Sequence, residues 1–127
     1  MLHEHHYTLD QATAVRGWVA DRIGSIRRSQ AELVALGAHA RAGIESLDPQ
    51  TGGSYPGREV ATALVAVSRA LNELEAVDVV VRDVERGLVD FPALRGGEEI
   101  YLCWLVDEDE IGFWHEPDAG FAGRQPL

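Results

Sequence analysis

The sequence predicts an α+β fold, in which a long antiparallel helical hairpin is followed by a small three- to four-stranded antiparallel sheet. Two observations predict the hairpin: apolar residues recur every seven positions over residues 12–40, and a second apolar stripe covers 60–74. A third observation predicts the sheet, because the apolar spacing changes near Val77 from the helical period to an alternating one.

The first helix is expected over about residues 9–42. Thr8 and Gln11 have the spacing of a capping box, in which each side chain accepts a hydrogen bond from the backbone amide of the other residue. Tyr7 precedes the cap, at the position of a hydrophobic staple. The stripe consists of Ala12, Val19, Ile26, Leu33 and Ala40, and it is widened by Val15, Ile23 and Leu36.

A second helix is expected over about residues 58–77, after a loop at 43–57 that is rich in turn-forming residues. Two helices with matching stripes and a polar loop between them pack antiparallel. The second stripe consists of Val60, Leu64, Val67, Leu71 and Leu74.

The hairpin over residues 7–77 and a sheet over 78–116 are expected to form a single domain, with a frayed N-terminus at 1–6 and a C-terminal tail at 117–127. The strand expected over 100–106 is apolar on both faces. One face can lie on the hairpin, and the other needs cover from the tail or from a second subunit. The sequence therefore predicts a homodimer or another protein partner.

The charge distribution excludes several kinds of partner. The chain has 21 acidic and 11 basic residues and a net charge of −10, all of it in residues 71–127, because residues 1–70 contain seven acids and seven arginines. An acidic surface repels nucleic acids and anionic membranes. No apolar run approaches the roughly 20 residues of a membrane-spanning helix, and the start lacks the pattern of a signal peptide. Together with the unpaired Cys103, this predicts a cytoplasmic protein.

The absence of lysine excludes further chemistry, since all 11 basic residues are arginines. A P-loop needs its lysine, and a Schiff-base enzyme needs a lysine amine. No glycine fingerprint of the Rossmann type follows a strand either. We therefore expect no nucleotide bound through a P-loop or a Rossmann motif.

Several stretches carry a resemblance to a known family. They are Tyr7–Ala12, Val81–Asp83, Gly87–Ala93, Ile100–Trp104, Ile111–Glu116 and Asp118–Pro126. These stretches resemble the bacterial family called domain of unknown function 2203. The family is uncharacterised, so the resemblance implies no activity, cofactor or catalytic residue.

Polar side chains near the C-terminus are the candidate site. Pro117 is expected to end the last strand, so His115 and Asp118 can converge with Asp90 from a neighbouring strand. A histidine with carboxylates suits a divalent metal such as zinc, iron or manganese. The alternative is that His115 and Asp118 form hydrogen bonds that hold the tail. Cys103 lies in the middle of an apolar strand and is expected to be a small core residue. To act as a nucleophile, its thiol would need a histidine nearby to lower its pKa, and His115 is the candidate.

Two functions follow from these residues. The preferred one is a non-enzymatic interaction or homodimerisation module. The other is a metal-dependent hydrolase, with Glu116 as the candidate catalytic base and Arg124 and Trp114 as ligand-binding residues. The alternatives for these two side chains are that Arg124 pairs with an internal carboxylate, either Glu116 or Asp90, and that Trp114 belongs to the core.

Overall fold

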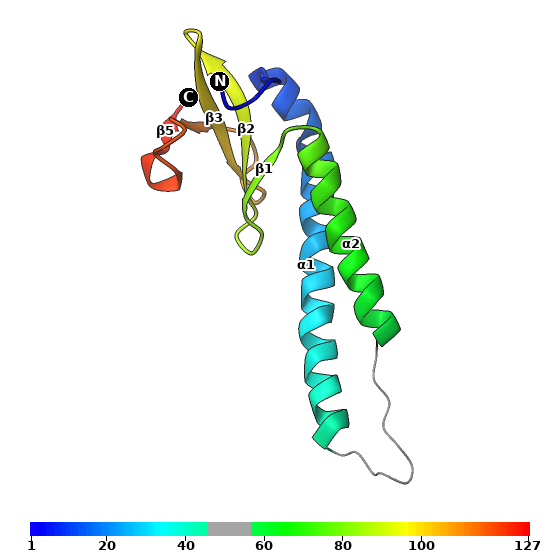
Figure 1. Cartoon of the computed structure of the whole chain (residues 1–127). Coiled ribbons are helices and arrows are strands. Elements are labelled where there is room, and N and C mark those ends of the chain that lie inside the picture. Colours follow the sequence, from blue (N-terminus) through cyan, green and yellow to red (C-terminus); the bar gives the residue numbers. More distant parts are fainter. Residues whose placement is uncertain (46–56) are drawn as a thin grey trace.

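The computed structural model describes the backbone of residues 1–45 and 57–127 and the side chains of residues 1–38 and 57–127. Two long helices pack antiparallel and one antiparallel sheet follows them, which confirms the predicted α+β class and the helical hairpin (Figure 1). The inter-helix loop predicted at 43–57 lies outside the described residues over 46–56. The helices are α1 (Leu9–Glu45) and α2 (Gly57–Ala76), and the strands are β1 (Val80–Asp83), β2 (Leu88–Arg95), β3 (Glu98–Leu105), β4 (Phe113–His115) and β5 (Gln125–Pro126).

The sheet is a meander in which each strand pairs with the next, in the order β1-β2-β3-β4-β5. It has five strands rather than the predicted three or four, because the tail returns through a short 3₁₀ turn (Phe121–Gly123) and pairs β5 with β4. A two-residue turn, Gly96-Gly97, joins β2 to β3, and both glycines have positive φ. This turn sets the register that places Asp90 opposite Cys103.

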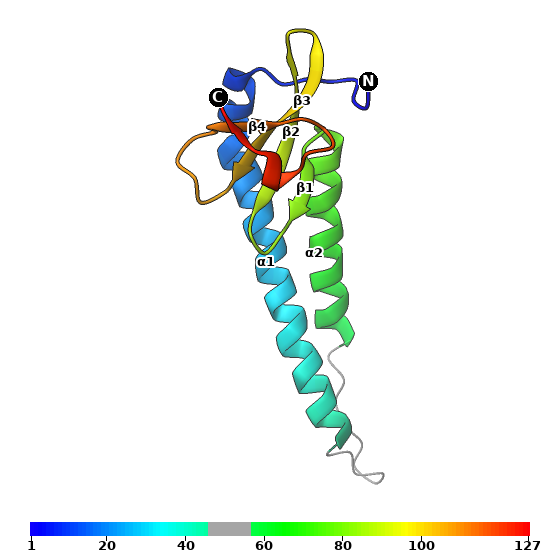
Figure 2. The same cartoon turned by 90° about the vertical axis from the view of Figure 1, so that its left-hand side faces the viewer.

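The core lies between the hairpin and one face of the sheet, beside the half of the hairpin that is nearer the chain ends (Figures 1 and 2). The capping box forms as predicted, with Thr8 N donating to Gln11 Oε1 at 2.9 Å and Gln11 N to Thr8 Oγ1 at 3.1 Å. Among the large side chains that meet in this core are Ile23, Ile26, Leu74, Phe91, Trp104 and Trp114.

The predicted stripe of α2 is only partly buried. Leu74 is fully buried, but Leu64 and Leu71 are 53% and 38% exposed, and the other buried residues of α2 are Ala63 and Ala70. The sheet ends near Arg27, which donates to the backbone oxygens of Val84 and Glu85 at 2.9 and 2.8 Å. Beyond this point the hairpin extends past the sheet, so part of its apolar face is left uncovered (Figure 1).

The N-terminal segment is anchored to the sheet, which corrects the expected frayed terminus. The amides of Leu2 and His3 donate to the two carboxylate oxygens of Glu99 at 2.8 and 3.1 Å, and His6 Nε2 lies 2.8 Å from the same side chain. His3 Nε2 is 2.7 Å from the Tyr101 hydroxyl oxygen. Tyr7 continues the contact, since its amide donates to the Pro92 oxygen at 2.6 Å and its ring packs edge-on against Phe91.

Acidification is expected to release this segment. The hydrogen bond from His6, together with those from the amides of Leu2 and His3, lowers the pKa of Glu99 from 4.5 to about 2. A lowered carboxyl pKa stabilises the attached state fully above about pH 4.5, and that stabilisation is lost as the pH falls toward 2. The protection of the Leu2 and His3 amides from hydrogen exchange, relative to unstructured reference amides at the same pH, should therefore fall over this interval.

The neighbouring carboxylate supplies the control for this experiment. Glu99→Gln should give fast exchange at Leu2 and His3 already at pH 7, whereas substitution of the exposed Glu98 by Gln should leave both amides protected. Protection that persists in Glu99→Gln would show that other contacts hold the segment.

Candidate functional site

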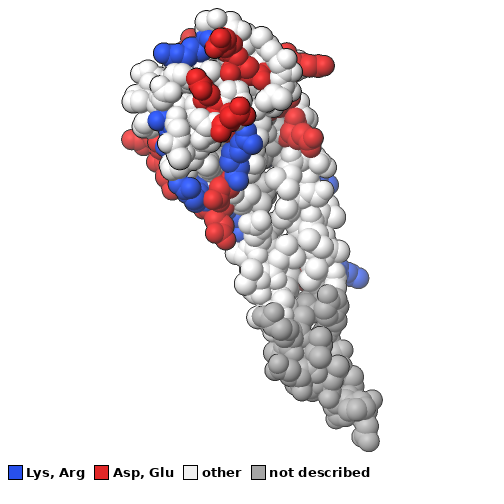
Figure 3. All heavy atoms as spheres, turned by 60° about the vertical axis from the view of Figure 1, so that its left-hand side comes forward, with Lys and Arg blue, Asp and Glu red and all other residues white. Residues whose placement is uncertain are grey.

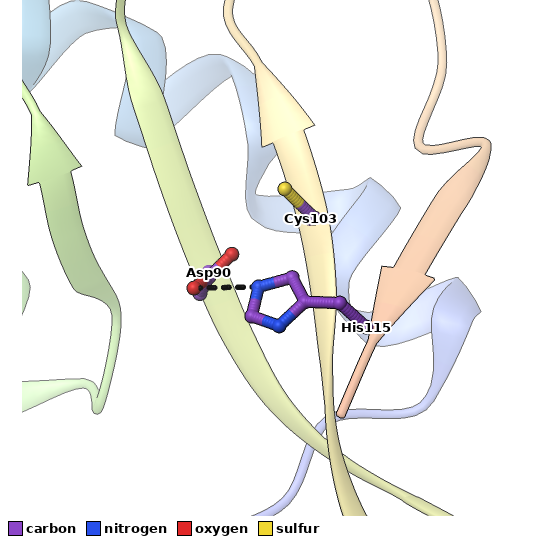
Figure 4. A group of neighbouring side chains, drawn as sticks. All are labelled: Asp90, Cys103 and His115. Atoms are coloured by element: carbon purple, nitrogen blue, oxygen red, sulfur yellow. Dashed lines mark hydrogen bonds and ion pairs between the residues drawn. The ribbon is translucent and has the colours of Figure 1, made fainter. Parts of the chain in front are cut away.

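Three buried side chains meet on the sheet face that points away from the hairpin: Asp90, Cys103 and His115 (Figure 4). Asp90 on β2 pairs with Cys103 on β3, and Cys103 pairs with Phe113 on β4. Because alternate residues of a strand share a face, His115 lies on the same side as Phe113. Each of three adjacent strands thus contributes one side chain, with exposed fractions of 1%, 0% and 2%.

Asp90 is the centre of the hydrogen bonds in this group. Its Oδ2 accepts from Arg82 Nε at 2.8 Å and lies 3.0 Å from His115 Nε2 (Figure 4). The other ring nitrogen, Nδ1, is 2.7 Å from the backbone oxygen of Glu116. The second carboxylate oxygen, Oδ1, is buried and has no hydrogen-bond partner among the described residues. A buried oxygen without a partner is uncommon, because its desolvation is not compensated.

The Cys103 thiol is protonated in this environment. Burial, and then the negative charge of Asp90, raises the pKa of the thiol from 9.0 to about 12. Both ring nitrogens of His115 face other partners, so neither serves as a base for the sulfur. The group therefore does not form a cysteine nucleophile in this conformation.

One part of the predicted metal set comes together and one part does not. Asp90 and His115 are in contact, whereas Asp118 is exposed in the turn after β4, outside the group. The third member within range is Cys103: one ligand atom from each of Asp90, Cys103 and His115 lies within 4.8 Å of the others.

The two residues that flank His115 face elsewhere. Glu116 has an exposed side chain, and only its backbone oxygen reaches the site. Trp114 points to the opposite face of the sheet and packs in the core. The Arg95 guanidinium lies over the Trp114 ring, 4.4 Å from its centroid. Both observations follow from the alternation of side chains along a strand.

Arg124 pairs with an internal carboxylate, but the partner is Glu108 rather than Glu116 or Asp90. Its Nη2 lies 2.6 Å from Glu108 Oε1, and the guanidinium lies 4.0 Å from the Phe113 ring centroid. Nη2 also donates to the backbone oxygen of Cys103 at 3.3 Å. The tail therefore supplies the cover that the outer sheet face needs (Figure 2).

An uncovered apolar face is the second candidate region. We name it the hairpin surface and define it by Val34 of α1, 74% exposed, with Leu64 and Leu71 of α2. Val34 follows the buried Ile23 by eleven positions, close to three helical turns, so it extends the sheet-facing side of α1 past the sheet. On the side of the molecule shown in Figure 3, the described part of the hairpin below the sheet is nearly free of charged side chains.

The fold and the two regions define a class: a helical hairpin joined to an antiparallel meander that holds a buried Asp-Cys-His group. A family model described as "Uncharacterized conserved protein (DUF2203)" matches residues 5–127, so the chain belongs to this family. No curated protein matches the chain. No solved structure matches it either. In the described part of the chain, neither helix has the combination of length and apolar character that crossing a membrane requires.

Proposed function

We propose that this protein is a non-enzymatic interaction module that forms a homodimer through the hairpin surface. The observation that carries the proposal is a set of exposed apolar side chains on the hairpin: Val34 and Leu64 lie where the hairpin runs past the sheet, and Leu71 follows Leu64 two turns along α2. Two helices alone cannot enclose a core. A second hairpin would complete a four-helix bundle, in which these side chains are removed from water.

The charge distribution favours a second copy at the hairpin rather than at the sheet. Residues 1–70, which include most of the hairpin, are neutral overall, whereas residues 71–127 carry the whole net charge of −10. Two sheets in contact would repel each other. If the two hairpins pack antiparallel to each other, the two acidic sheets lie at opposite ends of the dimer. The outer sheet face, the other surface considered for a partner, is covered by the tail.

The metal-dependent hydrolase receives less support from the geometry. A catalytic metal keeps an open coordination position for water and substrate, but the three side chains of the candidate group are at most 2% exposed. Glu116 and Asp118 lie outside the group, and Arg124 is already paired with Glu108. A cytoplasmic location is part of the proposal, since the free thiol of Cys103 is compatible with a reducing compartment.

The test is the molar mass in solution, measured by light scattering on the full chain. We expect twice the 13.9 kDa of one chain at micromolar concentration. Leu64→Glu should raise the dissociation constant by about a hundredfold or more, because it would place an unpaired charge in the bundle. The adjacent Val65 is equally accessible, at 56% against 53% for Leu64, but points about 100° away around the helix.

Val65→Glu is therefore the matched control, and it should leave the mass unchanged. Val34→Glu should act like Leu64→Glu, since Val34 is exposed and extends the sheet-facing side of α1 past the sheet. A monomer at every concentration of the unmodified chain would refute the proposal. A dimer that dissociates with Val65→Glu but not with Leu64→Glu would place the interface on another face and refute it equally.

A further inference from the structure

The buried group of Asp90, Cys103 and His115 brings together polar atoms that the hydrogen bonds of the described residues satisfy only in part. The carbonyl oxygen of Glu116 can only accept, so His115 Nδ1 must carry a hydrogen. In a neutral ring, Nε2 then has a lone pair, and this lone pair faces an oxygen of Asp90 at 3.0 Å. Two acceptors at this distance repel unless a proton or a cation lies between them.

A second observation points to the same place. Asp90 Oδ1 has no partner among the described residues although Asp90 is 1% exposed, and the thiol of its cross-strand neighbour Cys103 lies on the same side (Figure 4). The group therefore offers an oxygen, a sulfur and a nitrogen donor from three adjacent strands, all within 4.8 Å of one another.

We propose that Asp90, Cys103 and His115 bind one divalent cation of the zinc type. The ligand atoms would be Asp90 Oδ1, Cys103 Sγ and His115 Nε2. Asp90 Oδ2 would keep its hydrogen bond from Arg82, and His115 Nδ1 would keep its bond to Glu116. Partners of this kind orient the ligands of metal sites. Donors in a tetrahedral zinc site lie roughly 3.5 Å apart, so a small contraction of the group suffices.

The donor set selects the class of metal. Thiolate and imidazole favour zinc and related transition ions, whereas magnesium and calcium prefer oxygen ligands only. Iron and manganese, which the sequence also suggested, are less suited to a set that includes a thiolate and only one carboxylate.

The charge of the ligands suits a divalent cation even though the site is buried. Cys103 would bind as a thiolate and Asp90 as a carboxylate, so two negative ligands would offset the charge of the ion. Binding should therefore release a proton from the thiol.

Cobalt(II) titration of the full chain tests this proposal. The protein should be purified without a histidine tag and freed of metal by a chelator before the titration. We expect one equivalent of cobalt to bind with a thiolate-to-cobalt charge-transfer band in the near ultraviolet, and zinc to displace it. Calorimetry of zinc binding in buffers of different ionisation enthalpy should show proton release, because the Cys103 thiol must lose its proton to bind the ion.

Four variants complete the test. Cys103→Ala is a small change at a buried position, and it should abolish the charge-transfer band and weaken zinc binding at least about a hundredfold while circular dichroism stays native. Cys103→Ser should also remove the band and checks that packing is not the cause. Asp118→Ala, outside the group, and His5→Ala, whose side chain is 80% exposed, should both leave binding unchanged.

The results that would overturn the proposal are equally definite. They are the absence of stoichiometric cobalt binding by the unmodified chain, or binding without a thiolate band. Uptake that survives Cys103→Ala but is lost with Asp118→Ala would assign the metal to Asp90, His115 and Asp118 instead. None of these results depends on the dimer, whose test measures mass.

Discussion

His115→Leu is expected to lower the free energy of unfolding of the metal-free protein by about 2–3 kcal/mol. The substitution leaves the Asp90 carboxylate buried, with Oδ1 still unpartnered and Oδ2 bonded to Arg82 alone. Removing one partner of a buried hydrogen bond costs more than the bond itself contributes, because the remaining group stays desolvated. Urea denaturation in the presence of a chelator measures the change.

Substitution of Asp90, the other member of the pair, is the control, and its expected loss of stability is smaller. Asp90→Val should cost less, about 1–2 kcal/mol, because it removes the buried carboxylate and His115 keeps its Nδ1 hydrogen bond to Glu116. The double variant Asp90→Val/His115→Leu should lie within about 1–2 kcal/mol of the unmodified chain, since it leaves no charge in the group. Additive losses in the double variant would show that the two side chains act independently.

Gly87→Ala is the second large effect, with an expected loss of about 2–5 kcal/mol in the free energy of unfolding. Gly87 has φ +69°, and a Cβ there would lie 2.3 Å from Val106 Cγ2 and 2.7 Å from Arg27 Nη2. The methyl group would therefore displace the arginine that connects α1 to the turn between β1 and β2. Thermal or urea unfolding of the purified variant measures the loss.

Gly96→Ala separates the two causes of this loss. Gly96 also has a positive φ, +59°, but a Cβ there would meet nothing within 4 Å. It should cost only about 1–2 kcal/mol, from backbone strain. Equal losses at the two positions would mean that close packing around Gly87 contributes little.

The fold class could be predicted because it depends on local spacing. The change of period near Val77 separates helices from strands, and Thr8 and Gln11 mark the start of α1 within one turn of chain. The burial of α2 was less predictable. Its apolar stripe is wider than the part that α1 and the sheet cover, so Leu64 and Leu71 remain exposed although their spacing is that of a buried face.

The candidate site was only half predictable, because it depends on the pairing of strands. A signal for Cys103 was present: counting outward from the two-residue turn Gly96-Gly97 places position 90 opposite position 103. Asp118 could not be placed in this way, since the path of the chain after Pro117 depends on contacts of the tail with Glu108 and Phe113. The attachment of the N-terminal segment to Glu99 could not be predicted from local sequence patterns either. The bonded residues are separated by 96 and 97 positions in the sequence.

The anchoring of the N-terminus to Glu99 also orders the assembly of the protein during its synthesis. Leu2, His3 and Tyr7 leave the ribosome well before Pro92 and Glu99, which accept their hydrogen bonds. Closing such a long segment is entropically costly and slow compared with forming either helix. The beginning of the chain therefore remains unattached while α1 and α2 can already form, and it is fixed only when β2 and β3 are complete.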